Sequence, residues 1–144
     1  MLDSNVFVID RFFPRDAFHA DNKRFIDGLP RIDSGISLFT LLELAGIASF
    51  NLTPRELNSW VFAFGKVYSV SVIDPFGAGN GTAEHWIRMF FGDVADRIIR
   101  KMSFGDAVLL REAERYGAEA IVTWNTKDFS RRSPIPIRTP RHYL

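Results

Sequence analysis

Apolar positions along the chain follow two periods, one helical and one typical of short buried strands. A helical spacing of three or four residues predicts helices over 16–29, 40–50, 53–65, 82–102 and 104–116. Short apolar or β-branched runs predict strands over 35–39, 68–73 and 120–124. The run at 135–137 predicts an edge strand, because it contains a proline. Alternating strands and helices predict an α/β fold, with a parallel β-sheet flanked by helices on both faces.

Helix boundaries are marked by local capping patterns. Thr53, Pro54 and Glu56 have capping-box spacing with proline at the first helical position. Thr40 and Glu43 show the same box spacing, and Asp106 follows Ser103 at a related spacing. Each of these acids therefore has an ordinary interpretation, since it satisfies or stabilises a helix N-terminus.

Two apolar sets are candidates for the core. One face of the 82–102 helix carries Trp86, Met89, Phe90, Val94, Ile98, Ile99 and Met102. Four basic residues are expected on its opposite face: Arg88, Arg97, Arg100 and Lys101. A stripe of this kind usually belongs to a core. The second set, Trp60, Phe62 and Phe64, suits either the core or association with a partner.

Composition narrows the class of protein. The chain has 144 residues, a length that suits one domain spanning 1–144. It contains no cysteine, which excludes a disulfide scaffold and predicts a reducing, cytoplasmic setting. No apolar run is long enough to span a membrane, and the start lacks the basic region of a signal peptide. The net charge is +1, but basic residues gather from Lys127 onward, where they suit phosphate binding or form a solvated end.

Four separate segments each place an acid where a strand meets a helix. They are LDSN at 2–5, LLEL at 41–44, SFGDA at 103–107 and VTWNTKDF at 122–129. Ligands of open parallel sheets bind at the carboxyl ends of the strands, so these acids are expected to gather there. Carboxylate oxygens are the ligands that Mg²⁺ and Mn²⁺ prefer, and these ions leave positions for water and phosphate. The pattern predicts a phosphodiesterase, most simply a nuclease.

The same segments resemble a PIN domain, and within that family the VapC-like toxins of type II toxin-antitoxin systems. The resemblance covers nearly the whole chain, through LDSNVFV, TLLEL, the ending IRTPRHYL and above all residues 103–129. It implies a single PIN-like domain and a ribonuclease that uses Mg²⁺ or Mn²⁺ to leave 5′-phosphate and 3′-hydroxyl ends. It also implies an RNA substrate, a small antitoxin partner and a homodimer.

By position, the resemblance implies that Asp3, Glu43 and Asp106 hold the metal. Periodicity alone instead predicts a strand over 5–9 with Asp10 as its terminal acid. We prefer Asp3, which leaves only Met1 and Leu2 for the first strand, so that this strand is stunted or the natural chain starts upstream.

The fourth group of the site, at Asn125 or Asp128, departs from the commoner family pattern, and we call this position the fourth corner. Many relatives have Thr-x-Asp where this chain has Thr123, Trp124 and Asn125. Asp128, three residues on, is the alternative carboxylate and is included with the metal ligands. The catalytic set is therefore Asp3, Glu43, Asp106, Asn125 and Asp128. Contacts to the RNA backbone are assigned to Ser4, Asn5, Thr123, Lys127, Arg131 and Arg132.

Two alternatives of other classes remain open from the sequence. A catalytically silent PIN-like module would bind RNA or protein without cutting, and Asn125 favours it. A nucleotide-binding domain would use the glycine-rich loop over 77–82, but this loop lacks both the dinucleotide fingerprint and the P-loop lysine.

Overall fold

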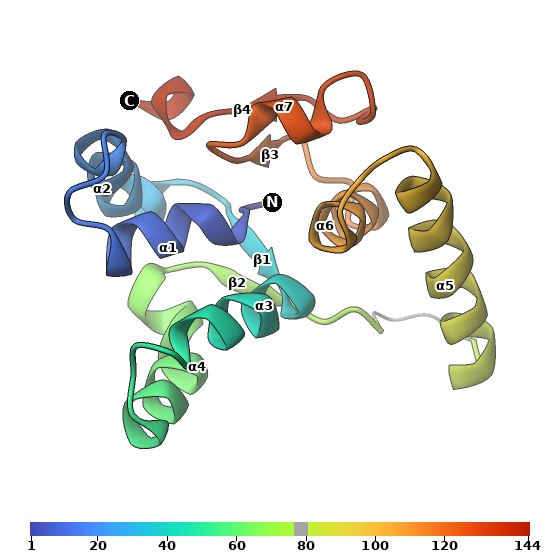
Figure 1. The fold of residues 1–144 in the computed structure, drawn as a ribbon, viewed down its shortest axis with the longest axis horizontal. Helices are drawn as coiled ribbons and strands as arrows, with labels where there is room; N and C mark the ends of the chain where they lie inside the picture. The colour runs from blue at the N-terminus through green and yellow to red at the C-terminus, as the bar shows by residue number, and fades with distance from the viewer. Residues whose placement is uncertain (77–80) are drawn as a thin grey trace.

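A computed structural model describes residues 1–76 and 81–144 (Figure 1). Its α-helices are α1 Ser4–Phe12, α2 His19–Gly28, α3 Leu38–Ala48, α4 Pro54–Tyr68, α5 Ala83–Ile99, α6 Phe104–Arg115 and α7 Thr126–Phe129. Its strands are β1 Gly35–Ser37, β2 Ser71–Ile73, β3 Ile121–Val122 and β4 Ile137–Arg138, and two 3₁₀ turns are η1 Leu29–Arg31 and η2 Pro140–Tyr143. The predicted α/β architecture is confirmed.

The N-terminal residues join two short parallel sheets into one. β1 pairs with β2, and β3 pairs with β4, both in parallel. Between them, the amide of Leu2 donates to the carbonyl of Gly35 at 2.8 Å, and Leu2 forms a parallel bridge with Val122. The sheet order is therefore β2, β1, the N-terminus, β3 and β4, with β4 at the edge as predicted. The first strand is as short as the sequence indicated.

Helices cover both faces of this sheet. Successive residues of a strand point to opposite faces, and the two cores follow that rule. Leu2 and Val122 belong to one core with residues of α1 to α4. Met1 and Ile121 contact the other core, which includes residues of α5 and α6. Figure 1 shows α1, α2 and α4 on one side of the strands and α5 and α6 on the other.

The segment after Asp3 is a helix, which corrects the strand that periodicity predicts. α1 starts at Ser4, and Asp3 is its N-cap residue in an extended conformation. Asp10 then lies near the end of α1, where its carboxylate accepts a hydrogen bond from the Tyr68 hydroxyl at 3.5 Å. The buried side chains of Val6 and Phe7 satisfy a helical period as well as a strand period, so tertiary packing decides between them.

Several element boundaries differ from the predicted ones by a few residues, and those of α3 and α4 have consequences. α3 starts at Leu38, because Ser37 and not Thr40 accepts the hydrogen bond that caps the helix. Glu43 therefore lies beyond the first turn, and its capping-box interpretation is wrong. α4 begins with the predicted capping box at Thr53 and runs through Tyr68, so β2 begins only at Ser71.

α5 spans the predicted region, but its apolar stripe is only partly buried. Val94 is 4% exposed, whereas Met89, Ile98 and Ile99 are exposed. Arg97 is not on the solvent side as predicted, since its guanidinium pairs with Glu114 of α6. α5 reaches the rest of the fold mainly through α6 (Figure 1), which explains the incomplete burial.

The structure also bears on the second apolar set, on membrane spans and on the glycine-rich loop. Trp60 and Phe64 are buried in the core, whereas Phe62 is exposed. Within residues 1–76 and 81–144, no helix combines the length and apolar composition needed to cross a bilayer. Most of the glycine-rich loop over 77–82 lies outside the described residues.

Candidate metal and phosphodiester site

Asp3 is the most buried acid of the candidate site. It is 8% exposed, and its position is fixed because Leu2 pairs with strands on both sides. The Thr123 hydroxyl donates to Asp3 Oδ2 at 2.6 Å, the Asn5 amide to the same oxygen at 2.7 Å, and the Ser4 hydroxyl to Oδ1 at 3.2 Å. Three side chains proposed from the sequence as RNA contacts therefore orient Asp3.

The electrostatic setting of Asp3 disfavours its ionised form. The pKa of Asp3 is raised to about 6, mainly by burial and also by the nearby Asp106 and Glu43 carboxylates, against the hydrogen bonds from Thr123 and Ser4. Asp106 and Glu43 are about 100 and 40 residues away in sequence but act on the same carboxylate. The fold thus brings Asp106 and Glu43 within electrostatic reach of Asp3.

Asp106 lies in the first turn of α6, where Ser103 is the cap. The Ser103 hydroxyl accepts from the Asp106 amide at 3.2 Å and donates to Asp106 Oδ2 at 2.6 Å. Burial raises the pKa of Asp106, the Ser103 hydrogen bond and the Arg132 charge oppose the rise, and the Asp128 charge adds to it. Asp106 is therefore both a capping partner and a member of the carboxylate cluster.

Glu43 reaches this cluster from α3 across the start of α6. A Cβ placed on Gly105 would lie 2.7 Å from Glu43 Oε1. The carboxylate can occupy this position only because residue 105 has no side chain. The sequence analysis does not single out Gly105, although its place directly before Asp106 is a signal for it.

Asn125 and Asp128 form the fourth corner as a pair. The Asn125 side-chain amide donates to the Asp128 carboxylate across the short helix α7. The Asn125 backbone amide also donates to the Thr123 hydroxyl at 2.9 Å, which links this turn to Asp3. Asp128 is close enough to act on the pKa of Asp106. The charged group of this corner is therefore Asp128, with Asn125 holding it.

The donor chemistry of the cluster fits a divalent cation. Asp3, Glu43, Asp106 and Asp128 offer only oxygen, as hard ions require, and a cation would relieve the repulsion that raises the pKa values of Asp3 and Asp106. Across the described residues, no three acidic or histidine side chains are grouped closely enough to hold an ion in the present arrangement.

A basic pocket lies beside the carboxylates. It has a volume of about 450 Å³ and is lined by Arg97, Arg100, Arg131 and Arg132, with Asp96 and Glu114 as the opposing charges. Arg132 connects it to the site, because its guanidinium donates to the Asp128 carbonyl at 2.9 Å and its charge acts on Asp106. The sequence identified Arg131 and Arg132. It also predicted a solvent-facing position for Arg97 and Arg100, which is confirmed for Arg100, the C-cap residue of α5, but not for the half-buried Arg97.

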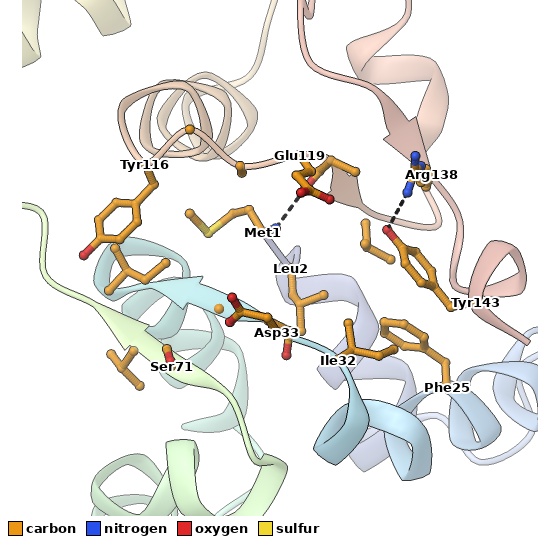
Figure 2. Close-up of a pocket in the computed structure, with 18 of the residues that line it drawn as sticks. Met1, Leu2, Phe25, Ile32, Asp33, Ser71, Tyr116, Glu119, Arg138 and Tyr143 are labelled. Atoms are coloured by element: carbon orange, nitrogen blue, oxygen red, sulfur yellow. Dashed lines mark hydrogen bonds between the residues drawn. The ribbon is translucent and has the colours of Figure 1, made fainter.

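A larger cavity of about 790 Å³ lies at the opposite end of the strands. It is lined by Gly35, Ser71 and Ala120, which stand at or just before the starts of β1, β2 and β3. Figure 2 shows Met1, Asp33 and Glu119 at this cavity. Asp3 and Asp128 lie just beyond the carboxyl ends of their strands, whereas Asp106 begins α6 directly after α5, so the prediction that a strand precedes it is wrong. The candidate acids are not among the residues that line the larger cavity, which is therefore separate from them.

The chain shares its fold with a protein of a toxin-antitoxin complex. No family model matches the sequence, and a search of curated proteins gives no match. A search of solved structures finds a chain of VapBC2 from Rickettsia felis, whose crystal structure contains a DNA fragment from the promoter. The match has a TM-score of 0.66 at 20% identity and covers 96% of both chains. At this identity the likeness shows the fold alone.

Proposed function

We propose that the protein is an Mg²⁺- or Mn²⁺-dependent endoribonuclease, acting as the toxin of a toxin-antitoxin pair. The observation that carries the proposal is the buried Asp3, whose pKa is raised by burial and by the charges of Asp106 and Glu43. Acids that come from separate elements and repel one another favour a bound cation, because a cation offsets that repulsion.

In this proposal, each residue of the site has a role in phosphodiester hydrolysis. Asp3, Glu43, Asp106 and Asp128 hold the metal, and Asn125 positions Asp128. When bound, such an ion polarises the phosphoryl group and lowers the pKa of the attacking water. Ser4, Asn5 and Thr123 act through Asp3, since their polar groups hydrogen-bond to its carboxylate.

The basic residues beside the cluster are proposed to bind the RNA backbone. The exposed Lys127 and the arginine-lined pocket supply positive charge next to acids that would otherwise repel a polyanion. Arg131 and Arg132 keep the role expected from the sequence, and Arg97 and Arg100 extend the same surface. Binding through such contacts weakens as salt is added.

The toxin role is supported by the shared fold with a chain of the VapBC2 complex. By that likeness we propose a small antitoxin as partner, a homodimer, and activity in the cytoplasm. The exposed apolar side chains of Phe62, Phe91 and Ile99 offer surface for such association.

Cleavage of defined single-stranded RNAs tests the proposal. Wild-type protein should cut in Mg²⁺ or Mn²⁺ and stop when chelator is added. Asp106→Asn should lose cleavage by about a hundred-fold or more, because it removes a metal-holding charge. Asp27→Asn is the matched control, since Asp27 is exposed on α2 and, among the described residues, forms its ion pair with Lys23 alone. RNA binding without any metal-dependent cleavage would instead favour the catalytically silent module.

The fourth corner has its own test. Asn125→Asp adds the carboxylate that many family members carry, so Mn²⁺ affinity should rise and cleavage should change with it. A metal titration followed by calorimetry measures the affinity. Unchanged affinity and rate would remove Asn125 from the site.

A further inference from the structure

Two aromatic rings stack beside the carboxylate site, and neither has a part in the metal chemistry. Phe18 precedes α2 and Trp124 follows β3, and their ring centroids are 4.5 Å apart with planes inclined by 11°. Phe18 is 38% exposed, and Trp124 is partly buried against the core. We call this pair the aromatic shelf.

The shelf is fixed to the same residues that hold Asp3. The Trp124 backbone amide donates to the Asn5 side-chain oxygen at 3.2 Å, while the amide nitrogen of that side chain binds Asp3. The Trp124 indole donates to Asn22 Oδ1 at 2.7 Å. Asn22 is itself buried and donates to the Val6 carbonyl at 2.8 Å. The indole therefore has a fixed orientation next to the reacting centre.

Arg141 adds positive charge to the edge of the shelf. Its guanidinium carbon lies 5.6 Å from the Phe18 centroid and 5.7 Å from the Trp124 centroid. Nearly equal distances place it beside the stacked pair, because a cation beyond Phe18 would be much farther from Trp124. Its Nε donates to Asp21 at 2.6 Å, and its terminal nitrogens have no hydrogen-bond partner within the described residues. The outer face of Phe18 is therefore not covered by Arg141.

We propose that the aromatic shelf stacks a nucleobase of single-stranded RNA next to the cleaved phosphodiester, with Arg141 facing the adjoining phosphate. This inference rests on the proposed ribonuclease function and extends it to substrate positioning. A ring with an open face beside an arginine is the usual means of holding an unpaired base, and stacking accepts every base. A purely structural stack would need neither the exposure of Phe18 nor a cation at its edge.

Binding of RNA with and without bases tests the shelf separately from catalysis. One probe is single-stranded oligoadenylate of about eight nucleotides, and the other is an abasic strand with the same phosphates. Both are measured by fluorescence anisotropy in chelator, so that nothing is cleaved. Wild-type protein should bind the base-containing strand more tightly. Phe18→Leu should weaken that binding roughly five-fold or more and leave the abasic strand unchanged.

Two further variants keep the result interpretable. Phe18→Tyr retains an aromatic ring and should keep the preference for bases. Phe50→Leu, at an exposed phenylalanine that follows α3, should change neither affinity. Equal loss on both strands, or no loss with Phe18→Leu, would overturn the shelf while metal-dependent cleavage could still stand. Failure of the wild type to bind either strand would overturn both the shelf and the proposed function.

Discussion

Asp3 shows how one residue combines burial, hydrogen bonding and repulsion. Three donors favour its ionised form, yet burial outweighs them and raises its pKa to about 6. A carboxylate in this setting gains most from a cation, because the cation offsets both the desolvation and the charges of Asp106 and Glu43. Its position between two strand pairs makes it the rigid corner of the site.

Asp3 also makes the stability of the fold depend on pH. A carboxyl whose pKa rises from 3.8 to about 6 on folding contributes stability at low pH that is lost as the pH rises through this window. The loss is about 3 kcal/mol at most. We expect urea unfolding to show that the wild type loses unfolding free energy relative to Asp3→Asn as the pH rises from 4 to 7, because the variant has no carboxyl to ionise at this position. A difference that stays constant with pH would contradict the raised pKa.

Gly105 provides a second test at the residue scale. Gly105→Ala places a methyl group against Glu43 Oε1, so the Glu43 carboxylate must move. Glu43 is exposed and flexible, so the unfolding free energy should change by less than about 1 kcal/mol. Mn²⁺ affinity should nevertheless fall about ten-fold, the usual cost of disturbing a ligand's support.

Gly46→Ala in α3 is the matched control, because nothing lies within 4 Å of its added Cβ. It should leave Mn²⁺ affinity unchanged. Equal affinities for both alanine variants and the wild type would place Glu43 outside the metal site.

At the scale of elements, capping patterns predict helix starts only where one candidate is present. The single box at Thr53 was identified correctly from the sequence. At α3 two candidates compete, and Ser37 prevails because β1 ends there and its hydroxyl also bonds Thr40. The sequence does not show where a three-residue strand ends, so it misplaced this boundary.

The box at the start of α4 gives a prediction for helix stability. The Thr53 hydroxyl accepts a hydrogen bond from the Glu56 backbone amide. The Glu56 carboxylate in turn accepts one from the Thr53 backbone amide at 2.8 Å. Thr53→Ala should lower the unfolding free energy by about 1 kcal/mol, measured by urea unfolding. Thr53→Ser keeps the hydroxyl and should lose much less. Equal losses in both variants would show that the cap contributes nothing.

The contact between α5 and α6 is held by a buried charge network. Arg111 is 2% exposed, and it binds Asp93 at 2.9 Å and Glu112 at 2.5 Å. Its guanidinium also lies 5.0 Å from the Phe90 ring centroid. Trp86 and Phe90, which periodicity places on the apolar stripe, lie against this guanidinium. Arg97, which periodicity places on the solvent side, instead pairs with Glu114 of α6.

Removing Arg111 should therefore be costly. Arg111→Ala leaves Glu112 buried without its main partner and should lower the unfolding free energy by about 3–5 kcal/mol. Adding Glu112→Gln to this variant should recover part of the loss, because no buried charge then remains unpaired. A loss below about 1 kcal/mol in urea unfolding, with no recovery in the double variant, would show that the network is not stabilising.

For the whole molecule, alternating strand and helix signals are sufficient to predict the α/β class. That Asp106 and Glu43 lie near enough to act on the pKa of Asp3 agrees with the expected proximity of these acids, and their role as metal ligands stays a prediction. The sequence could not predict how the two strand pairs join into one sheet. The junction depends on Leu2, which hydrogen-bonds to Gly35 and forms a bridge with Val122, and a segment of two residues is too short to show a strand periodicity. Nor could the sequence predict which residues support the candidate site. Gly105 and Trp124 gain their roles from residues that are distant in sequence.

The central claim is that the acids from four separate segments form one divalent-metal site: Asp3, Glu43, Asp106 and Asp128. Calorimetric titration of the wild type and Asp106→Asn with Mn²⁺, in buffers of different ionisation enthalpy near pH 6, tests it most directly. The wild type should bind saturably and release protons, because the pKa values of Asp3 and Asp106 are raised, and the variant should bind more weakly. Absence of saturable binding, or equal affinity in the two proteins, would contradict the account.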